Sequence, residues 1–135
     1  MAEPGTYPRA IYEKQLQCIV ADDRETQLRL YAEDVVYEFP FATDRPRLIY
    51  GRDAFRRVMT PLWDQARRAG IKVTGYDYRL LPTADPTLIA AEMTFSVATP
   101  AKSAKLPVVQ IMNIRRGEIA SVREYFNPQA RSELV

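Results

Sequence analysis

The chain has 135 residues, 47% of them hydrophobic and 27% charged, a composition typical of one globular domain. With 19 basic and 17 acidic residues the net charge is +2, and the basic residues are scattered, which argues against a nucleic-acid partner. There is no histidine and a single cysteine, Cys18. These counts exclude an intrachain disulfide, a His-dependent catalytic triad and a His-ligated metal site.

The two ends of the chain predict tails around one domain. Residues 1–8 contain Pro4 and Pro8 and are expected to form a disordered N-terminal tail, followed by a domain at 9–128 and a C-terminal tail at 129–135. Residues 1–8 also lack the basic start and apolar stretch of a signal peptide. No apolar run approaches the roughly 20 residues of a membrane span. We therefore expect a cytoplasmic protein without a membrane partner.

Helical patterns occupy the first half of the chain. Residues 9–21 place apolar side chains at the helical period, with Cys18 among the expected core residues and Gln15 near the centre of the apolar stripe. Asp23 is expected to cap a second short helix that runs through Tyr31. A third helix follows Gly51, and Pro61 within it predicts a kink or a restart.

Strand patterns dominate the second half. An earlier strand at 35–39 places Tyr37 and Phe39 on one face, and a loop is expected from residue 42 to 51. Four further strands are predicted, at residues 73–81, 88–98, 108–115 and 118–126. Helices followed by an antiparallel meander predict an α+β fold, with helices on one side of a bent sheet.

Three polar residues interrupt apolar faces of these elements. In the last strand, Glu124 alternates with Val122 and Phe126, so we expect it to point inward, where desolvation would raise its pKa and suit it to acid–base catalysis. It would otherwise face solvent at a sheet edge or pair with an arginine. Gln110 and Gln15 are the other two. They would either bind a polar ligand or only satisfy backbone groups or each other.

The remaining candidates are apolar or aromatic side chains on the same inward faces. They are expected to form the plain core or the wall of a ligand pocket. The candidates are Tyr37, Phe39, Trp63, Met93, Phe95 and Met112.

Several motifs, in this order and spacing, resemble the SnoaL-like members of the nuclear transport factor 2-like superfamily. They are residues 31–40 (YAEDVVYEFP), 50–55 (YGRDAF), 81–86 (LPTADP), 88–92 (LIAAE) and 123–128 (REYFNP). The last motif is also similar to the ending of the phenazine-biosynthesis A/B branch. The resemblance implies a cone-shaped α+β barrel, with three helices packed on a curved, mostly antiparallel sheet, an enclosed pocket and a homodimer.

The resemblance also implies roles for individual residues. A pocket acid or base of the phenazine-type proteins falls on Glu124, as does a catalytic Asp of limonene epoxide hydrolase, whose pocket tyrosine falls on Tyr37. Phe39 replaces an Asn of that enzyme and the base of ketosteroid isomerase. The oxyanion-binding residues of that isomerase fall on Gln15 and Gln110. Steroid isomerisation by that mechanism is therefore not expected.

Together these features predict an enzyme of natural-product biosynthesis. The expected activity is a cofactor-independent cyclase, isomerase or dehydratase in which Glu124 and Tyr37 act on a hydrophobic, polyketide-like intermediate. No phosphate-binding glycine pattern or metal cluster is present in the sequence, so no cofactor is expected. The alternatives are an epoxide hydrolase of the limonene epoxide hydrolase type and a non-catalytic dimeric module that binds small molecules.

Overall fold

Three helices of very different length form one layer of the protein. The computed structural model describes residues 7–130 and 134. The helices are α1 (Tyr7–Ala21), α2 (Arg24–Arg29) and α3 (Arg52–Arg68). Helix α1 buries Tyr12, Leu16 and Cys18, which confirms the predicted apolar stripe. Asp23 caps α2 as expected, because its side chain accepts a hydrogen bond from the Thr26 backbone N–H at 3.2 Å.

Two predictions about the helices are wrong. Tyr31 does not extend α2; it begins the first strand, because its backbone pairs in parallel with Ile119. The predicted restart at Pro61 does not occur either, since α3 continues through this residue. Pro61 is exposed and lacks only a backbone donor, and buried anchors on both sides of it, Met59 and Trp63, hold the helix in place.

Six strands form one sheet in the order β2-β1-β6-β5-β4-β3. Neighbours are antiparallel except β1 and β6, which run parallel. The strands are β1 (Tyr31–Glu38), β2 (Leu48–Tyr50), β3 (Lys72–Leu81), β4 (Leu88–Ala98), β5 (Ser103–Arg115) and β6 (Glu118–Phe126). The four-strand meander from β3 to β6 confirms the prediction.

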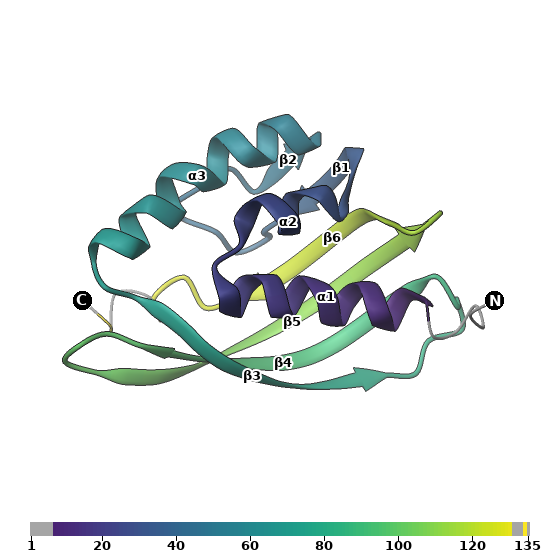
Figure 1. The fold of residues 1–135 in the computed structure, drawn as a ribbon. Helices are drawn as coiled ribbons and strands as arrows, with labels where there is room; N and C mark the ends of the chain where they lie inside the picture. Colours follow the sequence, from purple (N-terminus) through teal and green to yellow (C-terminus); the bar gives the residue numbers. More distant parts are fainter. Residues whose placement is uncertain (1–6, 131–133, 135) are drawn as a thin grey trace.

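The sheet and the helices form two layers. All three helices lie on one face of the sheet (Figure 1), with α1 against β3 and β4 and α3 against β1 and β2. The sheet curls around them but does not close. The α+β class is therefore confirmed, and the predicted barrel is an open, curled sheet. The core between the layers includes Tyr12, Tyr31, Tyr37, Phe39, Phe55, Met112 and Val122.

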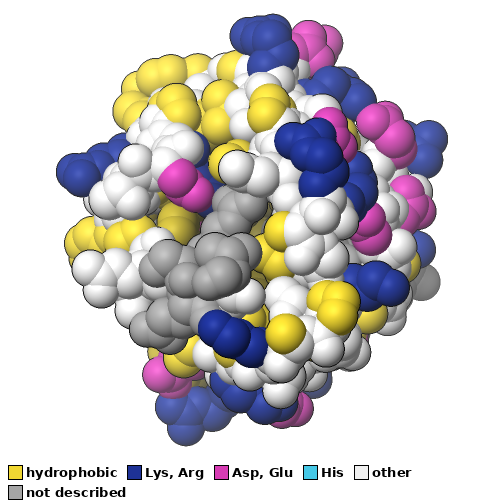
Figure 2. Space-filling model, turned by 90° about the vertical axis from the view of Figure 1, so that its left-hand side faces the viewer, with side chains coloured by type: hydrophobic (Ala, Val, Ile, Leu, Met, Phe, Trp, Pro, Cys, Tyr) yellow, Lys and Arg dark blue, Asp and Glu magenta, His cyan; other side chains and the backbone are white. Residues whose placement is uncertain are grey.

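The expected tails overlap the described structure at both ends. Helix α1 begins at Tyr7, within the predicted tail, whereas residues 1–6 lie outside the described residues. Of the last five residues only Leu134 is described, and it is buried. On the face where the chain ends, acidic and basic side chains are interspersed (Figure 2). None of the described helices is both long and apolar enough to cross a membrane.

Candidate active site

Glu124 lies where β6 passes between β1 and β5. The Glu124 backbone is directly opposite Gln110 in the antiparallel β5–β6 pair. On the other side of β6, in the parallel β1–β6 pair, Tyr37 lies opposite Val122. Val122 is buried and Arg123 is exposed, so alternation turns Glu124 toward the helix layer. The Glu124 side chain is half-buried, and of the two orientations that the strand pattern left open it takes the inward one.

Two side chains hold the Glu124 carboxylate by one of its oxygens. The Tyr37 hydroxyl donates to Glu124 Oε1 at 2.8 Å, and Gln110 Nε2 donates to the same oxygen at 2.7 Å. No side chain in the described ranges, 7–130 and 134, hydrogen bonds to Oε2. Two donors on one oxygen suit an ionised carboxylate, which only accepts hydrogen bonds. The arrangement fixes the carboxylate and leaves one oxygen for another partner.

Tyr37 is suited to remain a donor. It is 3% exposed, and burial raises the pKa of its phenol well above the ordinary value, with a further contribution from the Glu124 charge. The ring is fixed between Phe39 and Phe55, with ring centroids 4.6 and 4.5 Å away. The phenol therefore stays protonated, and its orientation toward Glu124 is set by packing.

A cavity of about 210 Å³ adjoins Glu124. Its wall is mainly apolar and includes Phe95, Val97, Val108 and Phe126 together with Leu134. A second cavity, of about 420 Å³, lies between α1, α3 and β3 and is lined by Trp63 and Arg24 among others. The two cavities adjoin, because both are lined by Ala66, Ile71 and Val73.

The structure separates the two predicted pocket amides. Gln110 is 1% exposed and contacts Glu124. Gln15 is fully buried on α1, and its side-chain amide lies 3.0 Å from the Tyr31 hydroxyl, to which its nitrogen donates. Neither oxygen of these two amides has a hydrogen-bond partner among the described residues. Gln110 thus belongs to the Glu124 cluster, whereas Gln15 belongs to a neighbouring cluster around Tyr31.

The predicted apolar candidates divide between the two cavities and the core. Phe39 packs beside Tyr37 and edge-on to Phe126, at 5.9 Å between ring centroids. Phe95 lines the cavity beside Glu124, and Trp63 lines the larger one. Met93 is buried and accepts a hydrogen bond from the Tyr12 hydroxyl at 3.3 Å. Met112 is fully buried in the core and lines neither of these cavities.

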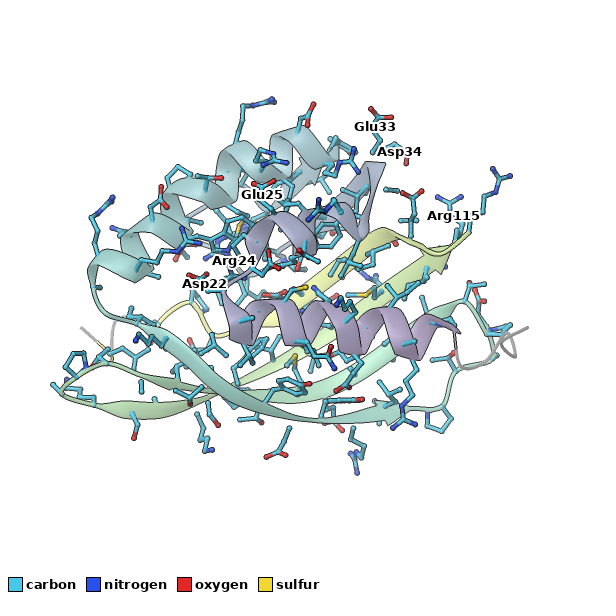
Figure 3. The ribbon with its side chains drawn as sticks, in the orientation of Figure 1. Asp22, Arg24, Glu25, Glu33, Asp34 and Arg115 are labelled. Atoms are coloured by element: carbon cyan, nitrogen blue, oxygen red, sulfur yellow. The ribbon has the colours of Figure 1, made fainter. Side chains whose placement is uncertain are left out.

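Two arginines near the cavities were not predicted from the sequence. Arg45, from the expected loop, lies over the rings of Phe39 and Phe126 at 4.8 and 5.1 Å and lines the cavity beside Glu124. Arg24 lies over the Trp63 ring at 4.7 Å, at the junction of α1 and α2 (Figure 3). Nothing in the local sequence distinguishes them from the other arginines, so only the folded chain identifies them.

The described residues offer no obvious metal site. Within residues 7–130 and 134, no group of three or more His, Cys, Asp or Glu side chains is arranged to hold a metal ion. Cys18 is buried, and burial raises the pKa of its thiol, which disfavours the nucleophilic thiolate. Glu124 is thus the strongest candidate for acid–base chemistry at the cavity.

Comparison with known proteins agrees with this architecture. The SnoaL-like domain family matches residues 12–122. A candidate isomerase from Bacillus subtilis superposes with a TM-score of 0.84 at 20% identity, over 98% of this chain and 95% of its own. A candidate polyketide cyclase from Xanthomonas campestris pv. campestris gives a TM-score of 0.73 at 16% identity, over 98% of both chains.

A third similar structure is a LEH-like epoxide hydrolase from Mycobacterium tuberculosis. Its TM-score is 0.63 at 20% identity, over 90% of this chain and 84% of its own. A search of curated proteins returned no match. At these identities the similar structures show a shared fold, on which several chemistries are known to recur.

Proposed function

The chain belongs to the SnoaL-like domain family, and from this premise we propose that it is a cofactor-independent isomerase or cyclase. Its substrate would be a small, largely apolar ketone of the polyketide type, and Glu124 would be the general base and acid. A homodimeric state, a biosynthetic role and a cytoplasmic location belong to the same proposal. The neighbouring structures named as candidate isomerase and candidate polyketide cyclase are consistent with this choice.

The observation that carries the proposal is the asymmetry of the Glu124 carboxylate. Oε1 accepts from both Tyr37 and Gln110, while the cavity beside Glu124 is walled by apolar side chains. A fixed carboxylate with a free oxygen at an apolar cavity can take a proton from a carbon next to a carbonyl group. Because the donors hold the other oxygen, the base does not have to reorient during the reaction.

The proposed reaction is a proton shuttle. Glu124 removes the proton on the α-carbon, and the electron pair of the broken C–H bond forms the enolate. In an isomerase, the protonated Glu124 returns the proton to a different carbon. In a cyclase, the enolate carbon attacks an electrophilic carbon of the same molecule, and Glu124 gives its proton to the oxygen that becomes negative. Neither version needs an oxidant, a reductant or a metal.

The cavity volume restricts the substrate. A volume of about 210 Å³ is below the roughly 300–1,000 Å³ typical of pockets for drug-sized ligands. A one- or two-ring ketone therefore suits the cavity beside Glu124 better than a larger polycyclic compound. A longer substrate would extend into the adjoining cavity past Ala66 and Ile71.

Proton exchange in heavy water tests the proposal without knowledge of the natural substrate. β-Tetralone is a two-ring ketone with acidic α-protons, and its deuteration is followed by NMR. We expect the wild type to accelerate exchange over protein-free buffer. The Glu124→Gln variant keeps an oxygen that can accept from Tyr37 and Gln110, so it should fold, and its catalysed exchange should fall by about 10²-fold or more.

Two results would contradict the proposal. One is an exchange rate in the Glu124→Gln variant equal to that of the wild type. The other is a wild type that exchanges β-tetralone no faster than buffer although the ketone binds.

A further inference from the structure

The larger of the two adjoining cavities, of about 420 Å³, differs from the one beside Glu124 in charge. Three cationic side chains and one anionic side chain line it, namely Arg24, Arg67, Lys72 and Asp22. The apolar part of its wall includes Ile19, Val20, Trp63, Ala66, Ile71 and Val73. A cavity with an apolar wall and an excess of positive charge suits a ligand that has an apolar body and an anionic group.

Arg24 has donors that the described residues do not use. Its Nε donates to Asp22 Oδ1 at 3.1 Å, and its Nη1 donates to Gln27 Oε1 at 2.8 Å. Among residues 7–130 and 134, Nη2 donates to no acceptor, although the side chain is only 18% exposed. The guanidinium lies over the Trp63 ring at 4.7 Å, so packing fixes its position. A fixed guanidinium with an unused amino group is suited to bind a carboxylate.

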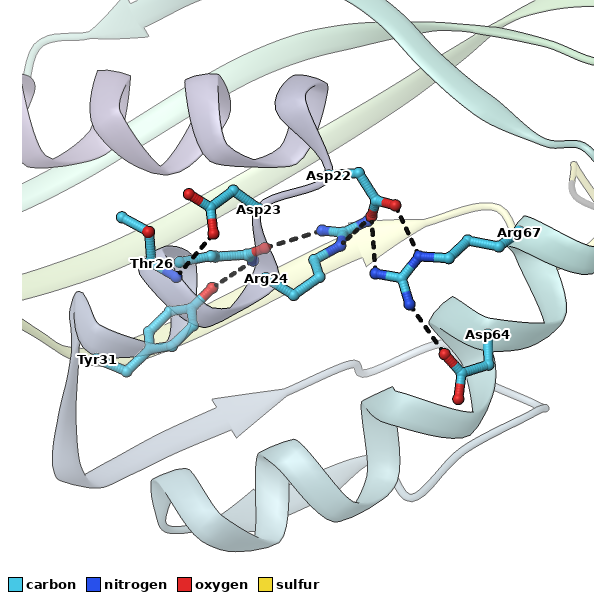
Figure 4. Close-up of polar contacts among 8 residues, drawn as sticks. Asp22, Asp23, Arg24, Thr26, Tyr31, Asp64 and Arg67 are labelled. Atoms are coloured by element: carbon cyan, nitrogen blue, oxygen red, sulfur yellow. Dashed lines mark hydrogen bonds and ion pairs between the residues drawn. The ribbon is translucent and has the colours of Figure 1, made fainter.

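Asp22 does not neutralise the cations of this cavity, because two arginines share it. Arg67 donates to both of its oxygens at 2.7 and 3.1 Å, while Arg24 donates to one of them (Figure 4). Burial lowers the pKa of Arg24 more than Asp22 raises it, so the positive charge of Arg24 is incompletely compensated. A buried charge in this situation is stabilised by an additional anion.

Lys72 adds a second cation at the cavity. It is the first residue of β3 and is exposed. Within the part of the chain that the structure describes, its ammonium group forms no ion pair. Arg67, by contrast, also pairs with Asp64 at 2.9 Å. Even when Asp64 is counted with the residues that line the cavity, three cations face two carboxylates, and one positive charge remains.

The ends of α1 and α3 border the cavity but do not use these cations. Basic side chains near a helix end often donate to its last carbonyl groups. Here backbone N–H groups already do so, since the Ile19 carbonyl accepts from Asp22 at 3.1 Å and the Ala66 carbonyl accepts from Ile71 at 2.9 Å. The cations of the cavity are therefore not needed as helix caps.

We propose that the larger cavity binds the carboxylate end of the substrate through Arg24 and Lys72. The substrate is then a keto acid, with its ketone beside Glu124 and its acidic end in the larger cavity. One molecule can reach both places, because Ala66 and Ile71 line both cavities. The ketone part of this inference rests on the proposed function, whereas the carboxylate part rests on the charges of the larger cavity alone.

Binding of a carboxylate would also orient the substrate. The cavity beside Glu124 is mainly apolar, and apolar contacts alone do not fix which end of a ligand enters it. A charge-assisted hydrogen bond at the opposite end is directional. A carboxylate held by Arg24 therefore limits the ways in which the ketone can approach Glu124.

The fluorescence of Trp63 tests the site without any turnover. Trp63 is the single tryptophan of the sequence and lines the larger cavity, so its emission reports a ligand bound there. Octanoate and octanamide have the same chain and nearly the same size, but only octanoate is charged. We expect the wild type to bind octanoate about tenfold more tightly. An octanoate affinity no higher than that for octanamide would overturn the inference.

Lys72→Gln removes one cation at an exposed position and should leave the fold intact. The affinity for octanoate should fall about two- to fivefold, and that for octanamide should not change. Lys14→Gln is the matched control, because Lys14 is an exposed lysine of α1 that does not line the cavity. It should keep the wild-type preference for octanoate. A Lys72→Gln variant with the wild-type preference would contradict the proposal.

Arg24→Gln should have the larger effect and reduce the preference for octanoate about tenfold. This variant also loses the contacts of Arg24 with Asp22 and Gln27. If it does not fold, the comparison of Lys72→Gln with Lys14→Gln still decides. A folded Arg24→Gln variant that keeps the preference would overturn the inference.

Deuterium exchange of 7-oxooctanoate and of its methyl ester links the site to the proposed function. We expect a KM for the acid about tenfold below that for the ester in the wild type. Equal KM values, with exchange that still depends on Glu124, would overturn this inference and leave the proposed function standing. Preferred binding of octanoate without catalysed exchange of either ketone would support the carboxylate site and contradict the proposed function.

Discussion

Two glutamates of this protein are held by two donors each, yet the structure uses them differently. Glu124 receives both donors on one oxygen. Glu13, on α1, accepts from the Tyr76 hydroxyl on Oε1 at 2.7 Å and from the Tyr78 hydroxyl on Oε2. Both residues are half-buried, so burial does not distinguish them. The difference is that no described side chain donates to Oε2 of Glu124, whereas both oxygens of Glu13 accept a hydrogen bond.

The surroundings of the two carboxylates differ as well. Glu124 adjoins an apolar cavity, whereas the tyrosines that hold Glu13 line a shallow depression with Arg9, Asp77 and Arg79. Glu13 joins α1 to the edge strand β3, since Tyr76 and Tyr78 both belong to that strand. A carboxylate whose two oxygens each accept from a tyrosine hydroxyl is a structural link, while one with an oxygen open to an apolar cavity can exchange a proton.

The largest expected effect is on the rate of catalysed exchange, which should depend on Glu124 and not on Glu13. Glu124→Gln should lose about 10²-fold or more of the catalysed exchange of β-tetralone, and Glu13→Gln should keep the wild-type rate. Both changes are isosteric and remove one charge, so each controls for the other. Deuterium incorporation measured under identical conditions checks the pair. Equal losses in the two variants would remove the proposed distinction.

The tyrosine donors allow a second, smaller test. Tyr37→Phe removes a buried donor to a charged group and should lower the free energy of unfolding by about 1.5–3 kcal/mol. Tyr78→Phe removes a half-exposed donor, and solvent screening should limit its cost to about 1 kcal/mol or less. Only the Tyr37 variant should also slow the exchange reaction. Chemical denaturation and the deuterium assay together measure both effects, and a slower reaction in the Tyr78 variant would count against the comparison.

Acid pH should reveal the structural role of Glu13. The hydrogen bonds from Tyr78 and Tyr76 lower the pKa of Glu13 below its ordinary value of 4.5. A lowered folded-state pKa contributes stability that is complete above the unfolded-state pKa and is lost as pH falls through the folded-state value. Below pH 4.5 the wild type should therefore lose stability more steeply than Glu13→Gln, as measured by urea denaturation at several pH values. The same pH dependence of stability in both proteins would show that the hydrogen bonds to Glu13 do not stabilise the fold.

The smallest effect is expected at alkaline pH. The hydrogen bond to Glu13 raises the pKa of Tyr76 from 10.0 to about 12. A raised folded-state pKa contributes stability that is complete below pH 10 and lost as pH rises toward 12. Between pH 9 and pH 11 the wild type should thus lose stability slightly faster than Tyr76→Phe, as measured by denaturant unfolding. An identical decline of stability in both proteins would show that Tyr76 does not cause the loss of stability at alkaline pH.

Regular strands were predictable because their side chains alternate. The limits predicted for β4 and β6 coincide with the structure at residues 88–98 and 118–126. Strand β2 lies within a predicted loop, since three residues carry no period and form a strand only by pairing with β1. Tyr31 was misplaced for a similar reason: a register shift in the β1–β6 pair interrupts its alternation with Val36.

The candidate site was also predictable only in part. Alternation placed Glu124 and Gln110 on otherwise apolar strand faces, the resemblance favoured an inward Glu124, and the helical period placed Gln15 on a buried face. The resemblance placed Tyr37 and Glu124 in one pocket, but the local strand patterns give no indication that Tyr37, 87 residues away, donates to Glu124, because that contact depends on the parallel pairing of β1 with β6.

The sequence by itself determined the meander, the apolar strand face on which Glu124 lies and the absence of histidine chemistry, because these depend on composition and on the local periods of helix and strand. Only the tertiary structure decided which donors hold the carboxylate and which oxygen remains free. Hydrogen-bond partners far apart in the chain are fixed by strand register and helix packing, and both are properties of the whole fold.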